Sequence, residues 1–226
     1  MVVTIHQPAY LPWLGYLDRI ARSDLFIFLD TVQFERNSFT NRNRIKSASG
    51  PLWLTIPVCL RNHLNTTIAD VDIDEQRDWR RKHLSTIAQN YRGAPGFSCR
   101  FDRLAASYAK ETSRLAELCF DQLAFWLVEL DIATPVVRAS ELPIEGRKSD
   151  LVLALCRHAG AHTYLSGPFG RDYLEEKKFA EAGIEVRYHE YAHPNYPQLH
   201  GEFVPAMGIV DYWMNCPDHR LFGGGK

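Results

Sequence analysis

The sequence predicts an α/β fold with a mostly parallel, Rossmann-like sheet flanked by helices, and with a helical insert or subdomain in the middle. Three observations predict this fold. Short β-branched, apolar runs alternate with helical segments in both the N-terminal and the C-terminal parts of the chain. Residues 25–30 (LFIFLD) form a continuous apolar run, which is typical of a strand buried on both faces of a parallel sheet. Residues 74–131 have helical spacing throughout.

The composition is that of a packed globular protein, and we expect residues 1–226 to form a single domain. The chain is 46% hydrophobic and 23% charged, which excludes overall disorder and a disulfide-stapled miniprotein. Its 26 Lys and Arg residues balance 27 Asp and Glu residues, so the formal net charge is only -1. No overall field therefore favours nucleic acid or an anionic membrane, and we do not expect nucleic acid as a partner.

The sequence also bears on the compartment. No apolar run approaches the roughly 20 residues that span a bilayer. The N-terminal MVVTIHQPAYLPW lacks a basic region and has a broken apolar stretch, unlike a signal peptide. The cysteines are odd in number, widely spaced and without a CxxC pair, which suits a reducing compartment (Cys59, Cys99, Cys119, Cys156 and Cys216). We therefore expect a cytoplasmic protein without membrane insertion.

The first thirty residues predict a βαβ unit. Residues 2–6 (VVTIH) are a β-branched run, and residues 25–30 are the buried strand described above. Between them, residues 12–24 have the spacing of a helix whose apolar side chains face inward (Leu14, Leu17 and Ile20). Pro12 fits the first turn of this helix.

The middle of the chain changes character twice. Residues 35–51 are polar, basic and rich in Asn and Ser, so we expect a functional loop there. The runs 52–58 and 67–73 predict further strands. The helical insert then follows, and glycine and proline residues separate its first two helices.

Strand and helix alternation resumes after the insert and predicts a second α/β half. The expected strands are at residues 135–140, 163–166 and 184–191. The helices between them end at Gly160 and Gly183, which suit helix C-caps. Beyond them we expect a loop, a short helix and a frayed tail (192–206, 207–215 and about 221–226).

His6 ends the first predicted strand, and the segment after it leads into a helix. Ligands of open α/β sheets bind outside the carboxyl ends of the strands, and a helix start there offers N–H groups to an anion. His6, Gln7 and Tyr10 are therefore candidates for lining a pocket. The alternative is that this segment only packs a tight turn, which we favour for Pro12 and Trp13.

The NRNRIK segment at residues 41–46 is a second candidate. Three cations and two amides in six residues suit a carboxylate, phosphate or sugar ligand (Asn41, Arg42, Asn43, Arg44 and Lys46). The alternative is a solvated basic loop.

Further polar positions lie at the ends of predicted elements. Ser166 and Gly167 begin SGPFG, which follows a strand and could hold an anion with its backbone, although it is neither a P-loop nor a GxSxG elbow. Asp30 and Asp211 are carboxylates at element ends, where the sequence leaves open a helix cap or a ligand contact.

HEYAH at residues 189–193 matches the H-E-x-x-H pattern of zinc hydrolases. Two histidines four residues apart stand about 6 Å apart on a helix but roughly 13 Å apart on a strand. The β-branched run before the motif and Pro194 after it favour an extended segment, so we expect no metal site here. RDWRRKH at residues 77–83 could contact RNA through Trp79, but we favour a solvated helix face.

Four ordered motifs resemble the WbqC-like family of bacterial proteins. They are HQPAYLPWLGYLD, DTVQFERNSFTNRNRIK followed by WLTIP, TYLSGPFGRDYL, and YPQLHGEFVPAMGIVDYWMN. The resemblance runs nearly from end to end and implies a role in surface polysaccharide biosynthesis, especially of O-antigen. The role that it implies is transfer of glycine or another small acyl group to a sugar.

Carried over residue by residue, the family pattern points to a set of functional positions (His6, Gln7, Pro8, Tyr10, Pro12, Trp13, Gly15, Asp30, Gln33, Asn41, Arg42, Asn43, Ser166, Gly167, Tyr173, Gln198, Pro205 and Asp211). This chain departs from the pattern twice. Phe39 stands where the family usually has Trp, and Gly208 stands where a Ser is expected. The second departure argues against a serine nucleophile at that position.

The leading hypothesis is an enzyme that transfers a small acyl or aminoacyl group from a donor to a sugar or nucleotide sugar. His6 would be the general base, because its ordinary pKa near 6.5 suits proton abstraction at neutral pH. The remaining positions would bind substrate. Arg42 and Lys46 would act through charge, and Gln7, Asn41 and Asn43 through their amides. Ser166 and Gly167 would supply backbone donors. Four further positions come from the family pattern or from the ends of elements (Tyr10, Asp30, Gln198 and Asp211). The sequence leaves the cofactor open.

Two alternatives stay open. The order strand, His-containing loop, helix and apolar strand resembles the opening of nucleotidyltransferases and adenylate-forming enzymes, which makes ATP a candidate ligand. Those families carry a pair of histidines where this segment has one. The other alternative is a noncatalytic binding or scaffold protein of a polysaccharide assembly complex, which would explain the many aromatic residues and the lack of a complete catalytic motif.

Overall fold

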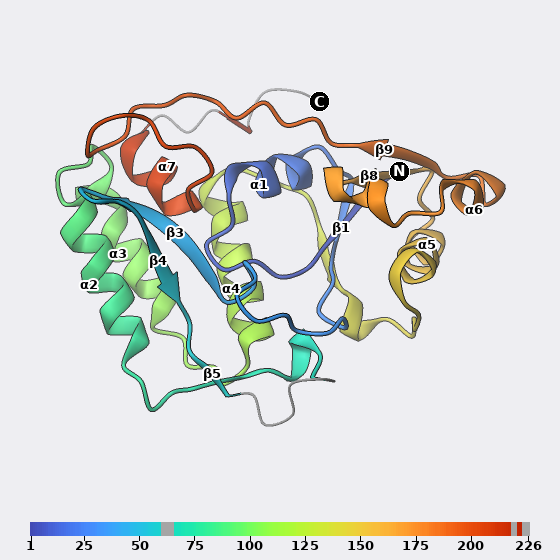
Figure 1. The fold of residues 1–226 in the computed structure, drawn as a ribbon, viewed down its shortest axis with the longest axis horizontal. Helices are drawn as coiled ribbons and strands as arrows, with labels where there is room; N and C mark the ends of the chain where they lie inside the picture. Colours follow the sequence, from blue (N-terminus) through green and yellow to red (C-terminus); the bar gives the residue numbers. More distant parts are fainter. Residues whose placement is uncertain (60–65, 218–220, 223–226) are drawn as a thin grey trace.

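A computed structural model of the chain describes residues 1–59, 66–217 and 221–222. Its centre is a five-stranded sheet in the order β7-β2-β1-β8-β9, and every neighbouring pair is parallel (Figure 1). The strands are β1 (Val2–His6), β2 (Leu25–Phe28), β7 (Val136–Arg138), β8 (Thr163–Ser166) and β9 (Glu185–Tyr188). The chain winds from β1 to one edge, returns, and winds from β8 to the other edge, which is the topology of a doubly wound sheet. The predicted α/β, Rossmann-like fold is confirmed.

The helices that connect the parallel strands follow the predicted pattern. They are α1 (Leu14–Ala21), α5 (Lys148–His158) and α6 (Glu176–Glu181). The inward side chains predicted for α1 are buried (Leu14, Leu17 and Ile20), although the helix begins after Pro12 and Trp13. Gly160 and Gly183 have φ values of 68° and 72°, which is the left-handed conformation expected at a helix C-cap.

The predicted functional loop at residues 35–51 is wrong over its second half. Residues Arg42–Ser47 form strand β3, which pairs antiparallel with β4 (Gly50–Thr55). Asn43 and Ile45 are buried on one face, while the Arg42 and Arg44 guanidinium groups lie 4.3 and 5.6 Å from the ring centre of Trp53. Over residues 42–45 the strand therefore alternates with period two, because Asn43 and Ile45 face the core and the two arginines lie on the other face with Trp53. Lys46 is buried as well and departs from this alternation.

The expected strand at residues 67–73 is mostly not a strand. A 3₁₀ turn at Ile68–Asp70 precedes the two-residue strand β6 (Asp72–Ile73), which pairs with β5 (Val58–Cys59). The run is apolar because Ile68, Val71 and Ile73 reach the core from this irregular segment.

The predicted helical region contains α2 (Trp79–Tyr91), α3 (Phe97–Tyr108) and α4 (Leu115–Glu129). The short predicted helix near the C-terminus, α7 (Ile209–Asn215), packs with them on one side of the molecule (Figure 1). Trp126 of α4 and Trp213 of α7 meet edge to face with ring centres 5.2 Å apart. In the part of the chain that the structure describes, no helix is long and apolar enough to cross a membrane.

The segment after β9 is irregular, as predicted for residues 192–206. Strand β9 ends at Tyr188, three residues before the predicted end, and the chain then runs back across the sheet toward α7 (Figure 1). The predicted helix that ends at Gly183 is divided into a 3₁₀ segment (Pro168–Asp172) and α6. Of the predicted frayed tail, residues 223–226 lie outside the described residues.

Candidate functional site

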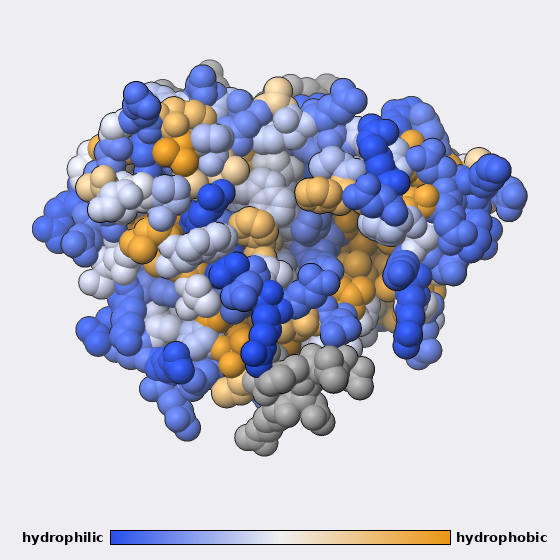
Figure 2. All heavy atoms as spheres, in the orientation of Figure 1, coloured by the Kyte–Doolittle hydropathy of each residue, from blue (hydrophilic) through white to orange (hydrophobic). Residues whose placement is uncertain are grey.

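A cavity of about 1050 Å³ lies at the carboxyl ends of β1 and β8. These adjacent strands are the point from which the chain winds in opposite directions, which is where doubly wound sheets bind ligands. His6 reaches the cavity from the end of β1, and Ser166 and Gly167 reach it from the end of β8. Apolar side chains of the sheet and α5 also line it (Ile5, Leu29 and Val152), and Figure 2 shows hydrophobic residues in a depression of this face.

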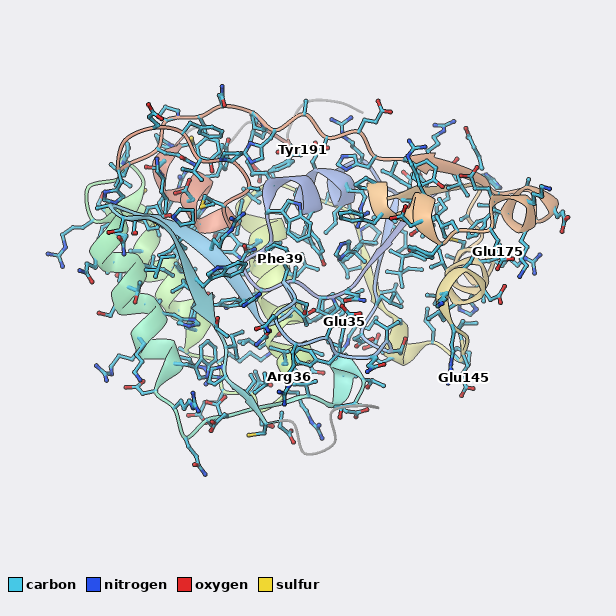
Figure 3. The ribbon with its side chains drawn as sticks, in the orientation of Figure 1. Glu35, Arg36, Phe39, Glu145, Glu175 and Tyr191 are labelled. Carbon is cyan, nitrogen blue, oxygen red and sulfur yellow. The ribbon has the colours of Figure 1, made fainter. Side chains whose placement is uncertain are left out.

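Two loops and the start of α1 form the rest of the wall. Figure 3 shows Tyr191, from the chain after β9, on one side of α1, and Phe39 and Glu35, from the loop after β2, on the other. Trp13 at the start of α1 lies 5.4 Å from the Phe39 ring, centre to centre. Phe39 thus contacts the aromatic wall although the family usually has Trp there. Such rings give a flat, apolar surface on which a sugar or base can stack.

His6 is held as a neutral imidazole. Its Nδ1 lies 2.8 Å from the Gln7 carbonyl oxygen, and because a carbonyl can only accept, Nδ1 carries the proton and donates it. Among the described residues Nε2 has no hydrogen-bond partner, so its lone pair is available. Burial, together with the nearby charge of Arg19, lowers the pKa of His6 to about 3. The imidazole is therefore uncharged at neutral pH.

Arg19 of α1 lines the same cavity, and the sequence interpretation missed it. The residue is only 6% exposed, yet within the described ranges its guanidinium has no hydrogen bond and no ion pair. Burial lowers its pKa from the ordinary value. On sequence alone Arg19 is one of several charged positions in a helix, and nothing in the spacing marks it as buried.

A second histidine of the cavity is oriented by a carboxylate. Nε2 of His189 lies 2.6 Å from Asp18 Oδ2, which also accepts a hydrogen bond from Arg22 Nε at 2.6 Å. Although burial opposes it, these two hydrogen bonds lower the pKa of Asp18. His189 belongs to the HEYAH motif, and its partner Asp18 lies 171 residues away.

The other histidine of HEYAH does not share a site with His189. His193 Nδ1 donates to the Pro194 carbonyl at 2.9 Å, and its Nε2 accepts from the Ala206 N–H at 3.2 Å. Over the described ranges, no three His, Cys, Asp or Glu side chains come together as metal ligands could.

The structure divides the predicted site residues into two groups. His6, Gln7, Ser166 and Gly167 line the cavity, and so do four further positions of the family pattern (Pro8, Trp13, Gly15 and Tyr173). The others do not (Tyr10, Asp30, Asn41, Arg42, Asn43, Lys46, Gln198 and Asp211). A binding role for this second group stays a prediction, because these residues lie outside the cavity lining.

The NRNRIK side chains make contacts within the protein. Asn41 Nδ2 donates to Ile56 O at 2.9 Å, and Asn43 Nδ2 donates to Leu11 O at 2.7 Å. Lys46 is buried, and its ammonium donates to the carbonyls of Gly201 and Glu202.

Arg42 contacts a residue of the cavity wall. Its Nη1 donates to Asn37 Oδ1 at 3.1 Å, and Asn37 is part of the cavity wall. Arg42 therefore supports the wall without lining it.

The two predicted carboxylates are saturated by protein donors. Asp30 is fully buried and accepts hydrogen bonds from Arg138 at 2.9 and 3.1 Å and from the backbone and hydroxyl of Ser140 at 2.9 and 2.7 Å. Asp211 accepts from Tyr91, Tyr196 and Gln198 at 2.7, 2.9 and 2.7 Å. Tyr10 similarly shares a buried cluster with His83 and Tyr108. These groups hold elements of the fold together.

Gly208, where the family pattern expects Ser, is tightly enclosed. A Cβ at this position would lie 2.9 Å from Leu11 O and 3.1 Å from Arg44 O. Gly, in place of the Ser of the family pattern, therefore stands where the backbone at position 208 approaches the backbones of Leu11 and Arg44 closely.

Comparison with known proteins agrees with the motifs. A chain of 34% identity, with an alignment over 226 residues that covers 97% of each protein, is uncharacterized protein Rv1507c of Mycobacterium tuberculosis (strain ATCC 25618 / H37Rv). No solved structure matches the chain. The profile of the WbqC-like protein family matches residues 7–221. Since this match spans nearly the whole chain, the protein belongs to the WbqC-like family.

Proposed function

We propose that the protein transfers a small acyl or aminoacyl group, with glycine as the suggested case, to the amine or hydroxyl of a sugar or nucleotide sugar in bacterial O-antigen biosynthesis. The observation that carries this proposal is the state of His6. A neutral imidazole with an available Nε2 lies at the carboxyl end of β1 in a large cavity. Such a group can accept a proton during attack on a carbonyl.

In the proposed step, the acceptor nitrogen or oxygen forms a bond to the acyl carbon of the donor. His6 Nε2 takes the proton from the acceptor. The bond from the acyl carbon to the donor's leaving group then breaks, and the leaving group receives the proton from His6. The lowered pKa of about 3 keeps the imidazole unprotonated before the step, but it also makes His6 a weaker base than an imidazole with the ordinary pKa near 6.5. Gln7 and Ser166 are placed in the same wall to orient the reacting groups.

The size and lining of the cavity support a ligand as large as a nucleotide sugar. Its volume of about 1050 Å³ lies at the upper end of the range for small-molecule sites, so a donor and an acceptor can be present together. Trp13, Phe39 and Tyr191 offer aromatic surfaces, and the cavity wall also carries polar and charged side chains, among them His6 and Arg19. This combination is typical of sites that stack a ring and orient it with hydrogen bonds.

The test is a transfer assay with a matched pair of histidine variants. Nucleotide sugars that raise the Tm of the protein would be incubated with glycyl and acetyl donors, and products would be followed by mass spectrometry. Transfer by the wild type that falls by at least 100-fold in His6→Gln and persists in His158→Gln, an exposed position on α5, supports the proposal. Full activity of a folded His6→Gln variant contradicts it.

The strand order favours a second candidate, an adenylate-forming or nucleotidyltransferase-like enzyme. A doubly wound sheet with its cavity at the switch point is a common nucleotide-binding arrangement. ATP-dependent pyrophosphate exchange that requires His6 would support this candidate over direct acyl transfer. Ligand binding without turnover in either assay would instead favour a noncatalytic binding or scaffold protein.

A further inference from the structure

Arg19 is a buried cation whose charge is not balanced by the protein. It lies on α1, is 6% exposed and lines the cavity. Among the residues that the structure describes, no carboxylate lies within ion-pair distance of its guanidinium and no carbonyl or hydroxyl accepts a hydrogen bond from it. Buried charges in folded proteins are normally paired, because removing an ion from water is costly.

Two other arginines of this protein, Arg100 and Arg138, have hydrogen-bond acceptors or ion-pair partners for their guanidinium groups. Arg100 is 7% exposed and donates to backbone carbonyls, including Cys216 O at 2.9 Å and Pro217 O at 2.6 Å. Arg138 forms ion pairs with Asp30 and Glu117. Arg19 is as buried as Arg100 and has neither kind of partner.

The groups that face Arg19 are phenols rather than anions. If they were ionised, three phenols would interact with the Arg19 charge: Tyr164, Tyr16 and Tyr173. Burial raises the pKa of each phenol above the ordinary value. They are therefore neutral at physiological pH. The acidic residues of the cavity wall, Glu35 and Glu190, are exposed and form no ion pair with Arg19.

The backbone also makes room for this guanidinium. A Cβ on Gly167 would overlap Nη1 of Arg19. The absence of a side chain at position 167 thus lets the guanidinium lie against the end of β8, beside Ser166. Helix α1 and the end of β8 therefore pack closely at the Arg19 guanidinium, whose charge no group of the described residues neutralises.

We propose that Arg19 is the anchor of an internal oxyanion subsite in the cavity, which binds the phosphoryl or carboxylate group of a ligand. The guanidinium fork matches two oxygens of such a group, and Arg binds both phosphate and carboxylate in this way. Tyr173 lines the same region and can add a phenolic donor, whereas the Tyr16 hydroxyl donates to the Gln7 carbonyl at 3.3 Å. The subsite rests on the proposed function, because it assigns an anionic substrate group to the cavity in which His6 would act.

The experiment measures binding of two simple probes to the whole protein. Inorganic phosphate and acetate are titrated separately at constant ionic strength, with chloride as the balancing anion, and binding is followed by calorimetry and by the Tm. The wild type binds at least one probe. Arg19→Met weakens that binding at least tenfold, which is about 1.4 kcal/mol, while Arg81→Met, a surface control with a 76% exposed side chain, keeps it.

A second variant, Gly167→Ala, leaves Arg19 in the chain but changes the position of its guanidinium. Gly167→Ala displaces the guanidinium and should weaken binding of the same probe, even if Arg19→Met proves poorly folded. Binding of phosphate alone identifies a phosphoryl group as the natural ligand group, and binding of acetate alone identifies a carboxylate. Binding of neither probe by the wild type, or equal binding by a folded Arg19→Met variant, overturns the inference.

The outcomes also separate this inference from the proposed function. Loss of transfer in His6→Gln with retained phosphate or acetate binding supports both. Probe binding that depends on Arg19, together with no transfer from any donor tested, supports the subsite and contradicts the transferase. Transfer with an unchanged KM in Arg19→Met supports the transferase and contradicts the subsite.

Discussion

The guanidinium of Arg19 lies in the space that any side chain at position 167 would need. Gly170 has a similar relation to Ser166, because a Cβ at position 170 would overlap the Ser166 hydroxyl. Neither glycine has a positive φ, so close approach rather than backbone conformation explains them. The two glycines of SGPFG therefore fit the loop to the side chains around it.

Gly96→Ala should destabilise the protein by about 1–3 kcal/mol, because a methyl there would lie 2.8 Å from Met214 O and 3.1 Å from Trp213 O, which are backbone atoms. Urea unfolding measures this change. Gly93→Ala is the matched control, since a Cβ there meets nothing within 4 Å and its φ is not positive. The control should be neutral or slightly stabilising, and an equal loss in both variants would contradict the packing argument.

Arg19→Met should stabilise the ligand-free protein. The variant removes a buried charge that has no partner in the described structure and keeps most of the apolar stem, so we expect a gain of about 1–3 kcal/mol. For a chain of this size each kcal/mol corresponds to about 2–4 °C in Tm. Differential scanning calorimetry without added phosphate is the measurement.

Arg100→Met is the control for this prediction. Arg100 is equally buried but donates to backbone carbonyls of the chain around α7, so its loss leaves those acceptors unpaired and should lower the Tm. A fall in Tm for Arg19→Met as large as for Arg100→Met would show that Arg19 has a structural partner.

His6 should make the protein less stable in mild acid. Its pKa is lowered to about 3 in the folded protein by burial and by Arg19, whereas the unfolded chain has a pKa near 6.5. Between these values the unfolded state binds a proton that the folded state does not, so stability is lost as the pH falls from about 6.5 toward 3. From pH 7 to pH 5 the loss from His6 is about 2 kcal/mol.

Urea unfolding at pH 7 and pH 5 tests this effect. His6→Gln should lose less stability over this interval than the wild type. His83, whose pKa burial lowers to about 4, contributes in the same direction, so His83→Gln is the matched comparison. An identical pH dependence in wild type and His6→Gln would show that His6 is not a depressed base.

The sheet and the end-of-strand candidates could be predicted because their pattern is local. The apolar runs that became β1, β2 and β8 are short and β-branched or continuous, and a parallel sheet places their carboxyl ends at one edge. That reasoning led to His6 and to Ser166 with Gly167, which line one cavity although they lie far apart in sequence, and also to Tyr10, which does not line it.

The rest of the site depends on contacts that no local pattern carries. Arg19 of α1 is buried against Gly167, which follows β8. His189, after β9, is oriented by Asp18 of α1. NRNRIK lies in a polar, basic segment rich in Asn and Ser, which favours a loop, although its alternation of Asn43 and Ile45 with Arg42 and Arg44 has the period of a strand.

The Tyr91 hydroxyl should be a structural group of the Asp211 cluster rather than part of a ligand site. It accepts a hydrogen bond from the Lys46 N–H of β3 at 2.9 Å and donates to Asp211 Oδ1 of α7 at 2.7 Å, so it joins a strand, α2 and α7. Tyr91→Phe leaves a buried donor and a buried acceptor unpaired and should cost about 1–3 kcal/mol in urea unfolding.

The matched control for Tyr91 is Tyr188→Phe, which removes a more exposed hydroxyl that donates to Glu176. Its cost in stability should stay within about 0.5 kcal/mol. Because the Asp211 cluster does not line the cavity, Tyr91→Phe should bind phosphate or acetate as the wild type does at a temperature where both are folded. Loss of probe binding in a folded Tyr91→Phe variant would instead show that Asp211 and its partners take part in the site, as the family pattern implies.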